Sequence, residues 1–361
     1  MSGNFTQRGE PSIINKWEKS KLAIQNGIDL VIELPTIYSI SSSENFAEGS
    51  IKILNSFGIV DFLSFGVETD DIQKLNTIAN ILSNESLEFK TILQSELSKH
   101  ISYPKALENS ITKLLGNDYK NILTPNNTLG IEYIKSLNKL RSSIKPLLIK
   151  RIENDYNDTK LDKISSATAI RNQLNNIDNL KIAIPENTFT KLKENNLVTS
   201  LSLFENEILY TLRMMNEGDL TNLPDISDEL VKRIKSASEK SNTLEELIKN
   251  IKTKTYTQAR IQRILLYILL KITKQDMEIS KQITPYIRIL GLNENGKKLV
   301  SKIKKQNSNL NIITSLKSYE NNCTDKKLLR LLEIDKKATD IYSLKRKTNY
   351  QSNQDYTTKL S

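Results

Sequence analysis

Residues 125–152, PNNTLGIEYIKSLNKLRSSIKPLLIKRI, place a loop, a helix-forming segment and a short apolar strand in direct succession. We interpret residues 125–140 as a loop that continues into a helix, and residues 144–152 as a strand. A helix that is followed at once by a strand is typical of folds in which helices and strands alternate. This stretch therefore favours the α/β class of fold.

The same alternation precedes it along the chain. Residues 12–26 are expected to form a helix, with Ser12 as its N-cap and Gly27 beyond its end. The segment DLVIELP at 29–35 predicts a buried strand, and residues 43–58 predict a helix that ends at a glycine. A further strand, VDFLSFG, is predicted at 60–66, and a further helix within residues 164–174.

Helices that alternate with strands are typical of a doubly wound parallel sheet. Strand signals stop at about residue 185, and the segments that follow have helical patterns. The sequence therefore predicts an α/β domain over residues 1–185 and a mainly α-helical domain over residues 186–361.

Composition limits the class of protein. The chain has 361 residues, of which 38% are hydrophobic and 26% charged, and no run of about 18 apolar residues predicts a membrane span. The single cysteine, Cys323, excludes an internal disulfide and is typical of a reducing cytoplasm.

Positive charge is concentrated in the last third of the chain. Residues 251–361 carry 23 Lys and Arg against 9 Asp and Glu, whereas residues 1–250 carry 29 against 33. This asymmetry favours contact between the C-terminal part and a polyanion such as nucleic acid. The alternative is a solvated, lysine-rich surface.

Ligands of doubly wound folds bind at the carboxyl ends of the strands, so the polar loops there are the candidate site. They are the opening loop MSGNFTQRGEP (1–11), FGVE (65–68), TPNN (124–127) and SSATAIR (165–171). Hydroxyls and N–H groups in the last loop could contact a phosphate, with Arg171 one turn into the helix. Each loop alone is weak evidence for a binding site, since Ser166 could simply cap a helix and Gly66 could form part of a turn.

Other chemistries have little support. No sequence feature places the only histidine, His100, in a catalytic pair with a nucleophile, and one Cys with one His excludes the usual zinc patterns. No metal site is expected. Neither a GxxxxGK[ST] nor a GxGxxG motif is present.

Taken together and in this order, the segments above and YTQARIQRILLYILL (256–270), PYIRILGLNENGKKLV (285–300) and IDKKATDIYSL (334–344) closely resemble the bacterial tRNA(Met) cytidine acetate ligase family. That family belongs to the nucleotidyltransferase superfamily, whose fold is a Rossmann-like parallel sheet. The resemblance implies an enzyme that activates acetate with ATP, with Mg2+ expected, and acetylates the wobble cytidine of elongator tRNA(Met). It implies acetate and RNA, rather than DNA, as partners.

The resemblance also implies roles for single residues. Arg171 and Ser166 would act in catalysis at the phosphates. The ATP contacts would be Gly66, Asn126 or, preferred, Asn127, Arg151, Ile152 and Thr168. The residues that contact tRNA would be Lys254, Arg260 and Arg263, of which the two arginines lie three apart on one helix face.

One departure from the family pattern concerns the beginning of the chain. Family members carry a first strand and a His-x-Gly-His loop before the segment that matches residues 1–11. Met1 aligns with an internal methionine of the family, so the first strand of the sheet and part of the ATP site are expected to be missing here. A start codon assigned too late, or a truncated gene, is the expected cause.

Two other functions stay open. One is a noncatalytic tRNA- or RNA-binding protein with a degenerate nucleotidyltransferase domain. The other is a nucleotidyltransferase that adenylylates a phosphorylated small molecule, although such a substrate would not need a basic domain.

Overall fold

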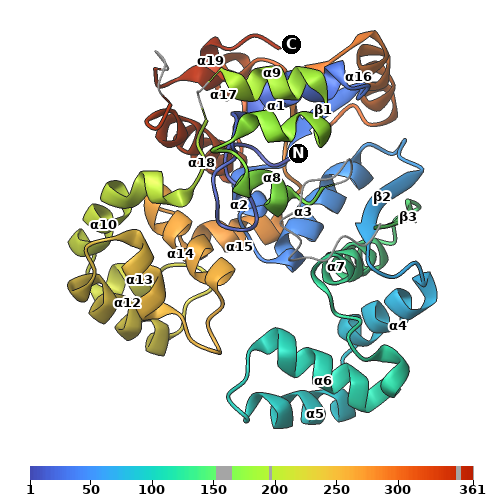
Figure 1. The fold of residues 1–361 in the computed structure, drawn as a ribbon. Helices are drawn as coiled ribbons and strands as arrows, with labels where there is room; N and C mark the ends of the chain where they lie inside the picture. The colour runs from blue at the N-terminus through green and yellow to red at the C-terminus, as the bar shows by residue number, and fades with distance from the viewer. Residues whose placement is uncertain (152–164, 195–196, 347–350, 361) are drawn as a thin grey trace.

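The computed structural model describes residues 1–151, 165–194, 197–346 and 351–360, and its fold is mixed α/β (Figure 1). The strands are β1 (Leu30–Glu33), β2 (Phe62–Val67), β3 (Lys145–Lys150), β4 (Ile287–Leu292) and β5 (Ile312–Ile313). They form two sheets, one of order β1-β4-β5 and one in which β2 and β3 pair in parallel. The predicted α/β class is confirmed.

Helices surround both sheets. Those of the first half are α1 (Lys16–Gln25), α2 (Thr36–Ser39), α3 (Ser43–Ser56), α4 (Ile72–Ser83), α5 (Leu87–Leu97), α6 (Tyr103–Leu115), α7 (Pro125–Lys139), α8 (Ala167–Asn172) and α9 (Glu186–Lys193). Those of the second half are α10 (Glu205–Met214), α11 (Glu217–Thr221), α12 (Asp228–Lys240), α13 (Leu244–Ile251), α14 (Gln258–Leu270), α15 (Lys274–Gln282), α16 (Glu294–Gln306), α17 (Leu316–Asn322), α18 (Lys326–Ser343) and α19 (Gln354–Thr357). Short 3-10 turns are η1 (Asn117–Tyr119), η2 (Ile177–Ile182) and η3 (Leu201–Phe204).

The first helix begins later than predicted. Asn15, not Ser12, is the N-cap of α1, and its side chain accepts a hydrogen bond from the N–H of Glu18. Ser12 is buried instead, and its N–H donates to the carbonyl of Asn4 at 2.8 Å. This bond holds the chain before α1 against the opening loop, so the helix cannot start there.

The second half is not entirely helical, which corrects the prediction that strands stop at residue 185. Strand β4 pairs antiparallel with β1, and Ile289, for example, lies opposite Ile32. The run from Ile287 to Gly291 is buried throughout and lacks the alternation that makes a half-exposed strand recognisable. The β1-β4-β5 sheet therefore crosses the boundary predicted at residue 185.

The strands also do not form one continuous sheet. Met1 and Ser2 occupy the edge of β1 opposite to β4, with Ser2 bridged to Leu34 in parallel. Both edges of β1 are thus occupied, and among the described residues β2 and β3 pair only with each other. A cavity of about 320 Å³, lined by Met1 and Leu34 on one side and Leu63 on the other, lies between the two sheets.

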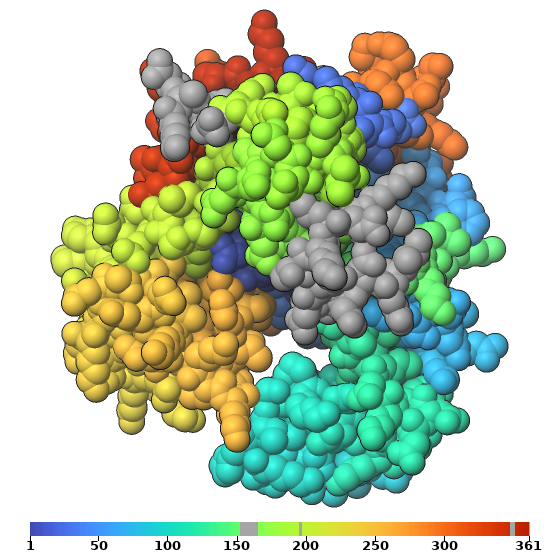
Figure 2. Space-filling model, viewed as in Figure 1, coloured from blue at the N-terminus to red at the C-terminus, as the bar shows by residue number. Residues whose placement is uncertain are grey.

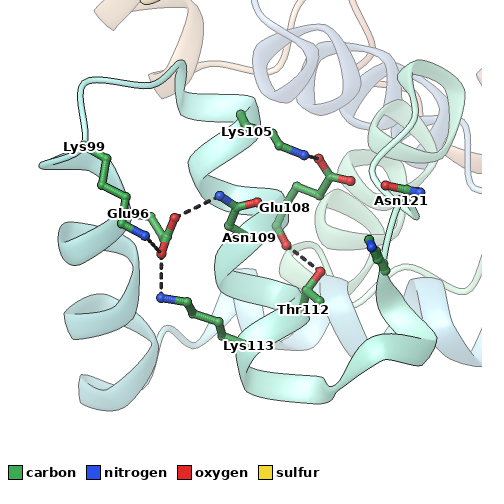
Figure 3. A pocket seen from close by; sticks show the side chains of 9 residues that line it. Glu96, Lys99, Lys105, Glu108, Asn109, Thr112, Lys113 and Asn121 are labelled. Carbon is green, nitrogen blue, oxygen red and sulfur yellow. Dashed lines mark hydrogen bonds and ion pairs between the residues drawn. The ribbon is translucent and has the colours of Figure 1, made fainter.

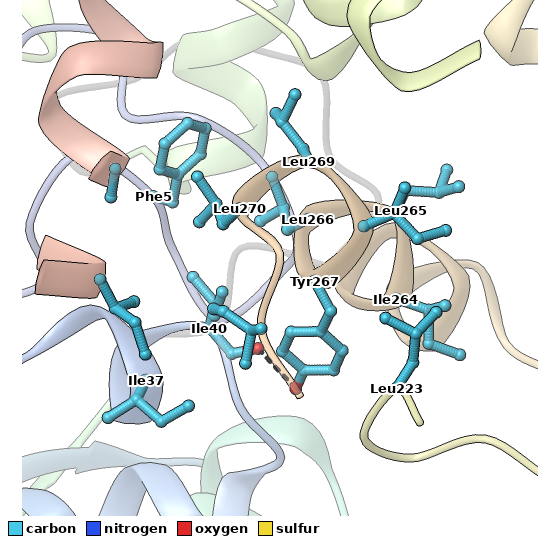
Figure 4. Close-up of a cluster of buried hydrophobic side chains, with 14 of the residues drawn as sticks. Phe5, Ile37, Ile40, Leu223, Ile264, Leu265, Leu266, Tyr267, Leu269 and Leu270 are labelled. Atoms are coloured by element: carbon cyan, nitrogen blue, oxygen red, sulfur yellow. Dashed lines mark hydrogen bonds between the residues drawn. The ribbon is translucent and has the colours of Figure 1, made fainter. Parts of the chain in front are cut away.

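The largest apolar core surrounds α14 and includes the opening loop (Figure 4). Phe5 is 1% exposed and packs against Phe204 and Tyr342. On α14, the Tyr267 hydroxyl donates to the carbonyl of Ile40 at 3.2 Å. The opening loop is therefore an ordered part of the core. Among the described residues, no helix has both the length and the apolarity that a membrane span requires.

Helices α5 and α6 form a hairpin held together by one carboxylate (Figure 3). The buried Glu96 accepts from Lys99 and Lys113, both at 2.6 Å, and from Asn109 at 2.9 Å. The bonds from Lys113, Lys99 and Asn109 lower the pKa of Glu96 to about 2 against the opposing effect of burial. The charged carboxylate thus links the two helices through ion pairs and a hydrogen bond.

This pKa predicts a pH dependence of stability. A carboxylate whose pKa is lower in the folded state stabilises the fold above its unfolded pKa of about 4.5, and this contribution is lost as the pH falls toward 2. Glu96→Gln should therefore lower the melting temperature at pH 7, and the difference from wild type should shrink between pH 4.5 and pH 2.5. Thermal unfolding followed by circular dichroism measures this. The exposed Glu88→Gln on α5 is the control, and an equal pH dependence of both variants would contradict the prediction.

Candidate active site

Gly66 and Arg151 lie side by side at the carboxyl ends of β2 and β3. The Arg151 N–H donates to the carbonyl of Val67 at 2.8 Å. A Cβ added at Gly66 would lie 3.5 Å from Cγ of Arg151. Both residues are exposed, so this end of the sheet leaves backbone and a guanidinium open to a ligand. Ile152, the next predicted contact, lies outside the described residues.

The TPNN segment, predicted as a loop, is instead the N-cap and first turn of α7, and Glu68 attaches it to the end of β2. The Glu68 carboxylate accepts from the Thr124 hydroxyl at 2.6 Å, from the side-chain amide of Asn126 at 2.6 Å and from the N–H of Asn127 at 2.9 Å. Burial raises the pKa of Glu68, but these hydrogen bonds outweigh it, and the net shift is downward. The two loops predicted to approach the ligand are therefore joined by one charged residue.

The two asparagines of this segment, Asn126 and Asn127, have different surroundings. Asn127 is 2% exposed; its Oδ1 accepts from the N–H groups of Glu68 and Thr69, and its Nδ2 donates to the carbonyl of Ile122. Its side chain is fully used inside the protein. Asn126 is half-buried. Its N–H and its Nδ2 both donate to Glu68, and its side-chain oxygen has no hydrogen bond to any described residue. The geometry thus favours Asn126 over the preferred Asn127 as a residue that can contact a nucleotide.

The opening loop meets the SSATAIR loop at α8. Ser166 caps α8, and its hydroxyl accepts from the N–H of Ala169 at 3.0 Å. The Thr168 hydroxyl accepts from Nη1 of Arg8 at 3.3 Å, which joins segments 160 residues apart. The capping role considered for Ser166 is thus present, and its backbone and the side chain of Thr168 lie beside a cation.

Three cations, Arg8, Lys19 and Arg171, gather here, and we call them the cation cluster. Burial and the charge of Arg8 lower the pKa of Arg171, while Glu10 opposes this shift. Burial lowers the pKa of Lys19 to about 8, and Arg171 acts in the same direction. Mutual repulsion of this kind is relieved when an anion binds, so the cluster is suited to phosphate.

Two residues of this region and Glu68 were not anticipated from the sequence. Lys19 is one of several lysines in α1 and has no local sign of burial. Glu10 adjoins Arg8 in the opening loop, but its partners Leu201 and Gln262 are distant in sequence. Glu68 could have been found, since it is the charged residue of the FGVE segment that was selected at the end of a predicted strand.

The predicted tRNA contacts in the second half are only partly free. Arg260 and Arg263 both bind Asp225, with Nε–Oδ1 at 3.2 Å and Nη2–Oδ2 at 3.7 Å. The side chain of Arg263 is only 13% exposed. Lys254 is exposed and makes no ion pair with any described residue. Of the three, Lys254 is the one whose charge is available to a partner.

Figure 2 shows where these elements lie on one face of the molecule. A hollow separates the α5–α6 hairpin from the segment around residues 250–260. The cation cluster combines Arg8 of the opening loop, Lys19 of α1 and Arg171 of α8, and the opening loop passes α8 near the centre of the fold (Figure 1). The groups at β2–β3 and at α8 are connected through residues 152–164, which lie outside the described residues.

Comparisons with known proteins agree with this architecture. A family profile described as HIGH Nucleotidyl Transferase matches residues 1–357. The tRNA(Met) cytidine acetate ligase of Acetivibrio thermocellus is 40% identical over 358 residues, covering 95% of this chain and 86% of the relative. That of Clostridium novyi is 42% identical over 320 residues, covering 85% and 80%.

Two solved structures are similar to this chain in fold. The crystal structure of apo Thermotoga maritima TmcAL has a TM-score of 0.91 and 30% identity, covering 99% of this chain and 89% of that one. The crystal structure of the same protein bound with alpha-thio ATP has a TM-score of 0.89 and 29% identity, covering 99% and 90%. This chain therefore belongs to the HIGH nucleotidyl transferase family and, within it, to the tRNA(Met) cytidine acetate ligases.

Proposed function

We propose that this protein is an ATP-dependent ligase that activates acetate as acetyl-adenylate and acetylates N4 of the wobble cytidine of elongator tRNA(Met). The observation that carries the proposal is the similarity to named acetate ligases along nearly the whole chain. The cation cluster, in a fold shared with a relative bound to alpha-thio ATP, supports the ATP-dependent step.

In the first step, a carboxylate oxygen of acetate attacks the α-phosphorus of ATP, and the bond from that phosphorus to the β-phosphate oxygen breaks. Pyrophosphate leaves. Gly66, Asn126 and Arg151 would contact the nucleoside part, where the strand ends are open. Arg171, with the N–H groups near Ser166 and the hydroxyl of Thr168, would stabilise the negative charge that develops on the phosphate oxygens.

In the second step, N4 of the cytidine attacks the acetyl carbonyl carbon, N4 loses a proton, and AMP leaves. The base must be exposed from its stack for this reaction. The basic C-terminal part would hold the RNA, with Lys254 as the available side chain among the three predicted contacts.

Mg2+ would accompany ATP in this proposal. No group of three His, Cys, Asp or Glu side chains converges among the described residues. Mg2+ commonly binds through substrate phosphates with only one or two protein carboxylates, so ATP would supply most of its ligands. No step above depends on a residue of this chain binding the ion.

The test is acetate-dependent exchange of labelled pyrophosphate into ATP by the native protein purified from its own cells. Exchange that requires acetate, and does not require tRNA, is the expected result. A control reaction with a phosphorylated small molecule in place of acetate detects a different nucleotidyltransferase. Binding of tRNA(Met) without exchange would overturn the ligase proposal in favour of a noncatalytic RNA-binding protein.

A further inference from the structure

A second cavity lies beside the cation cluster, between the opening loop, η3 and helices α13 and α14. Its volume is about 490 Å³, within the range of small-molecule sites. Its lining includes Glu10, Leu201, Ser202, Ile248 and Gln262. We call it the Glu10 pocket.

A carboxylate and an amide form the polar edge of this pocket. Glu10 accepts from the N–H of Leu201 at 2.8 Å, and its other oxygen accepts from Nε2 of Gln262. Gly9 has a φ of +78°, and a Cβ there would lie 2.5 Å from Cβ of Gln262. The opening loop is thus pressed against α14, and the pair is fixed in place before any ligand arrives.

The other walls have a different character. Leu201, Leu244 and Ile248 contribute apolar surface. Lys249 and Lys252, on α13 and just beyond it, carry positive charge, and Glu245 on α13 carries one negative charge. Lys249 makes no ion pair with any described residue. Apolar walls, a polar edge and a rim on which two lysines outnumber one glutamate suit a flat heterocycle attached to a phosphate chain.

The pocket adjoins the groups assigned to the phosphates. Glu10 is two residues from Arg8, which binds Thr168 at the start of α8. The charge of Arg171 acts on the Glu10 carboxylate, although burial is the larger effect and the pKa of Glu10 is raised. A ring in the pocket would therefore lie close to an adenylate held at α8.

We propose that the Glu10 pocket receives the cytosine ring of the RNA substrate, with Glu10 and Gln262 reading its edge. This inference rests on the proposed function. Cytosine presents the N4 amino group as a donor beside the N3 and O2 acceptors, which a carboxylate and an amide N–H complement. Uracil presents O4 instead, and this oxygen would face the carboxylate. Acetate is too small to fill the pocket, and the nucleoside of ATP has already been assigned to the residues Gly66 and Arg151.

The test is a substitution at the rim of the Glu10 pocket that places a large side chain in the cavity. Ser202 is exposed and lines the pocket, so Ser202→Trp projects an indole into it, whereas the exposed Thr199→Trp, three residues away, does not. We expect Ser202→Trp to reduce the rate of tRNA(Met) acetylation about tenfold or more, since base recognition contributes effects of this size. Pyrophosphate exchange should stay within about twofold of wild type, and Thr199→Trp should leave both unchanged.

A second readout concerns the base itself. A stem–loop with cytidine at the wobble position should bind wild type about tenfold more tightly than one with uridine, and Gln262→Met should reduce that preference. Equal acetylation by the two tryptophan variants, or an unchanged preference in Gln262→Met, would overturn the pocket assignment. Absence of exchange in wild type would instead overturn the proposed function, so the two failures are distinguishable.

Discussion

Arg171→Met is expected to lower kcat/KM for acetate-dependent pyrophosphate exchange about a hundredfold, which is typical for loss of one preorganised group that stabilises developing charge. The half-buried Arg171 lies one turn into α8, where burial and the charge of Arg8 lower its pKa and Glu10 opposes this shift. Methionine keeps the apolar stem and removes only the guanidinium. Steady-state exchange assays at several ATP concentrations would measure the loss.

The matched control is Arg141→Met, an exposed arginine in the loop between α7 and β3. It should retain wild-type exchange. Arg171→Lys should recover part of the rate, because an ammonium keeps the charge without the fork of donors. A loss of less than threefold in Arg171→Met would show that the phosphates bind elsewhere.

Arg288→Met is expected to lower the free energy of unfolding by about 3–5 kcal/mol, which is the usual cost of breaking a buried ion pair from one side. Arg288 on β4 is 2% exposed, and its Nη2 lies 2.9 Å from Oδ1 of Asp355. Its Nε lies 3.5 Å from Glu33 on β1. Lys16 binds the same two carboxylates, at 2.9 Å to Glu33 and 2.8 Å to Asp355.

Without Arg288, two buried carboxylates would share a single lysine. Urea unfolding measured by fluorescence of Trp17 would report the change, because Arg288 lies over the Trp17 ring at 5.3 Å. Lys281→Met, which breaks an exposed pair with Glu278, is the control and should cost about 1 kcal/mol or less. A similar small loss in both variants would mean that the buried network adds little stability.

Local features of the sequence were sufficient to predict many of the helices and strands in the first half of the chain. Helix α3 and strands β1, β2 and β3 lie where spacing, proline and glycine predicted them, and α7 begins at Pro125, earlier than predicted. These signals are short-range, since caps and apolar periodicity depend on neighbours within about one or two helical turns. The order of the motifs was also sufficient for the family, and the comparisons confirmed it.

The candidate site was predictable only in part. Gly66 and Arg151 meet because parallel strands end at a common edge, which is a general property of the fold class. Asn126 and Asn127 are neighbours with identical side chains, so the sequence does not tell which of them faces a ligand. That choice depends on Glu68, whose hydrogen bonds turn one asparagine inward.

The α/β class, the mainly helical second half and the segments that carry the polar groups all follow from local patterns in the sequence. Contacts between distant segments do not: β4 lies beside β1, Glu10 binds Gln262, and Arg260 and Arg263 bind Asp225. The physical reason is that a local pattern fixes the direction and conformation of a segment, whereas its partner is chosen by burial over the whole chain. A lysine such as Lys16 looks solvated in its helix and becomes a core residue only because two carboxylates from elsewhere reach it.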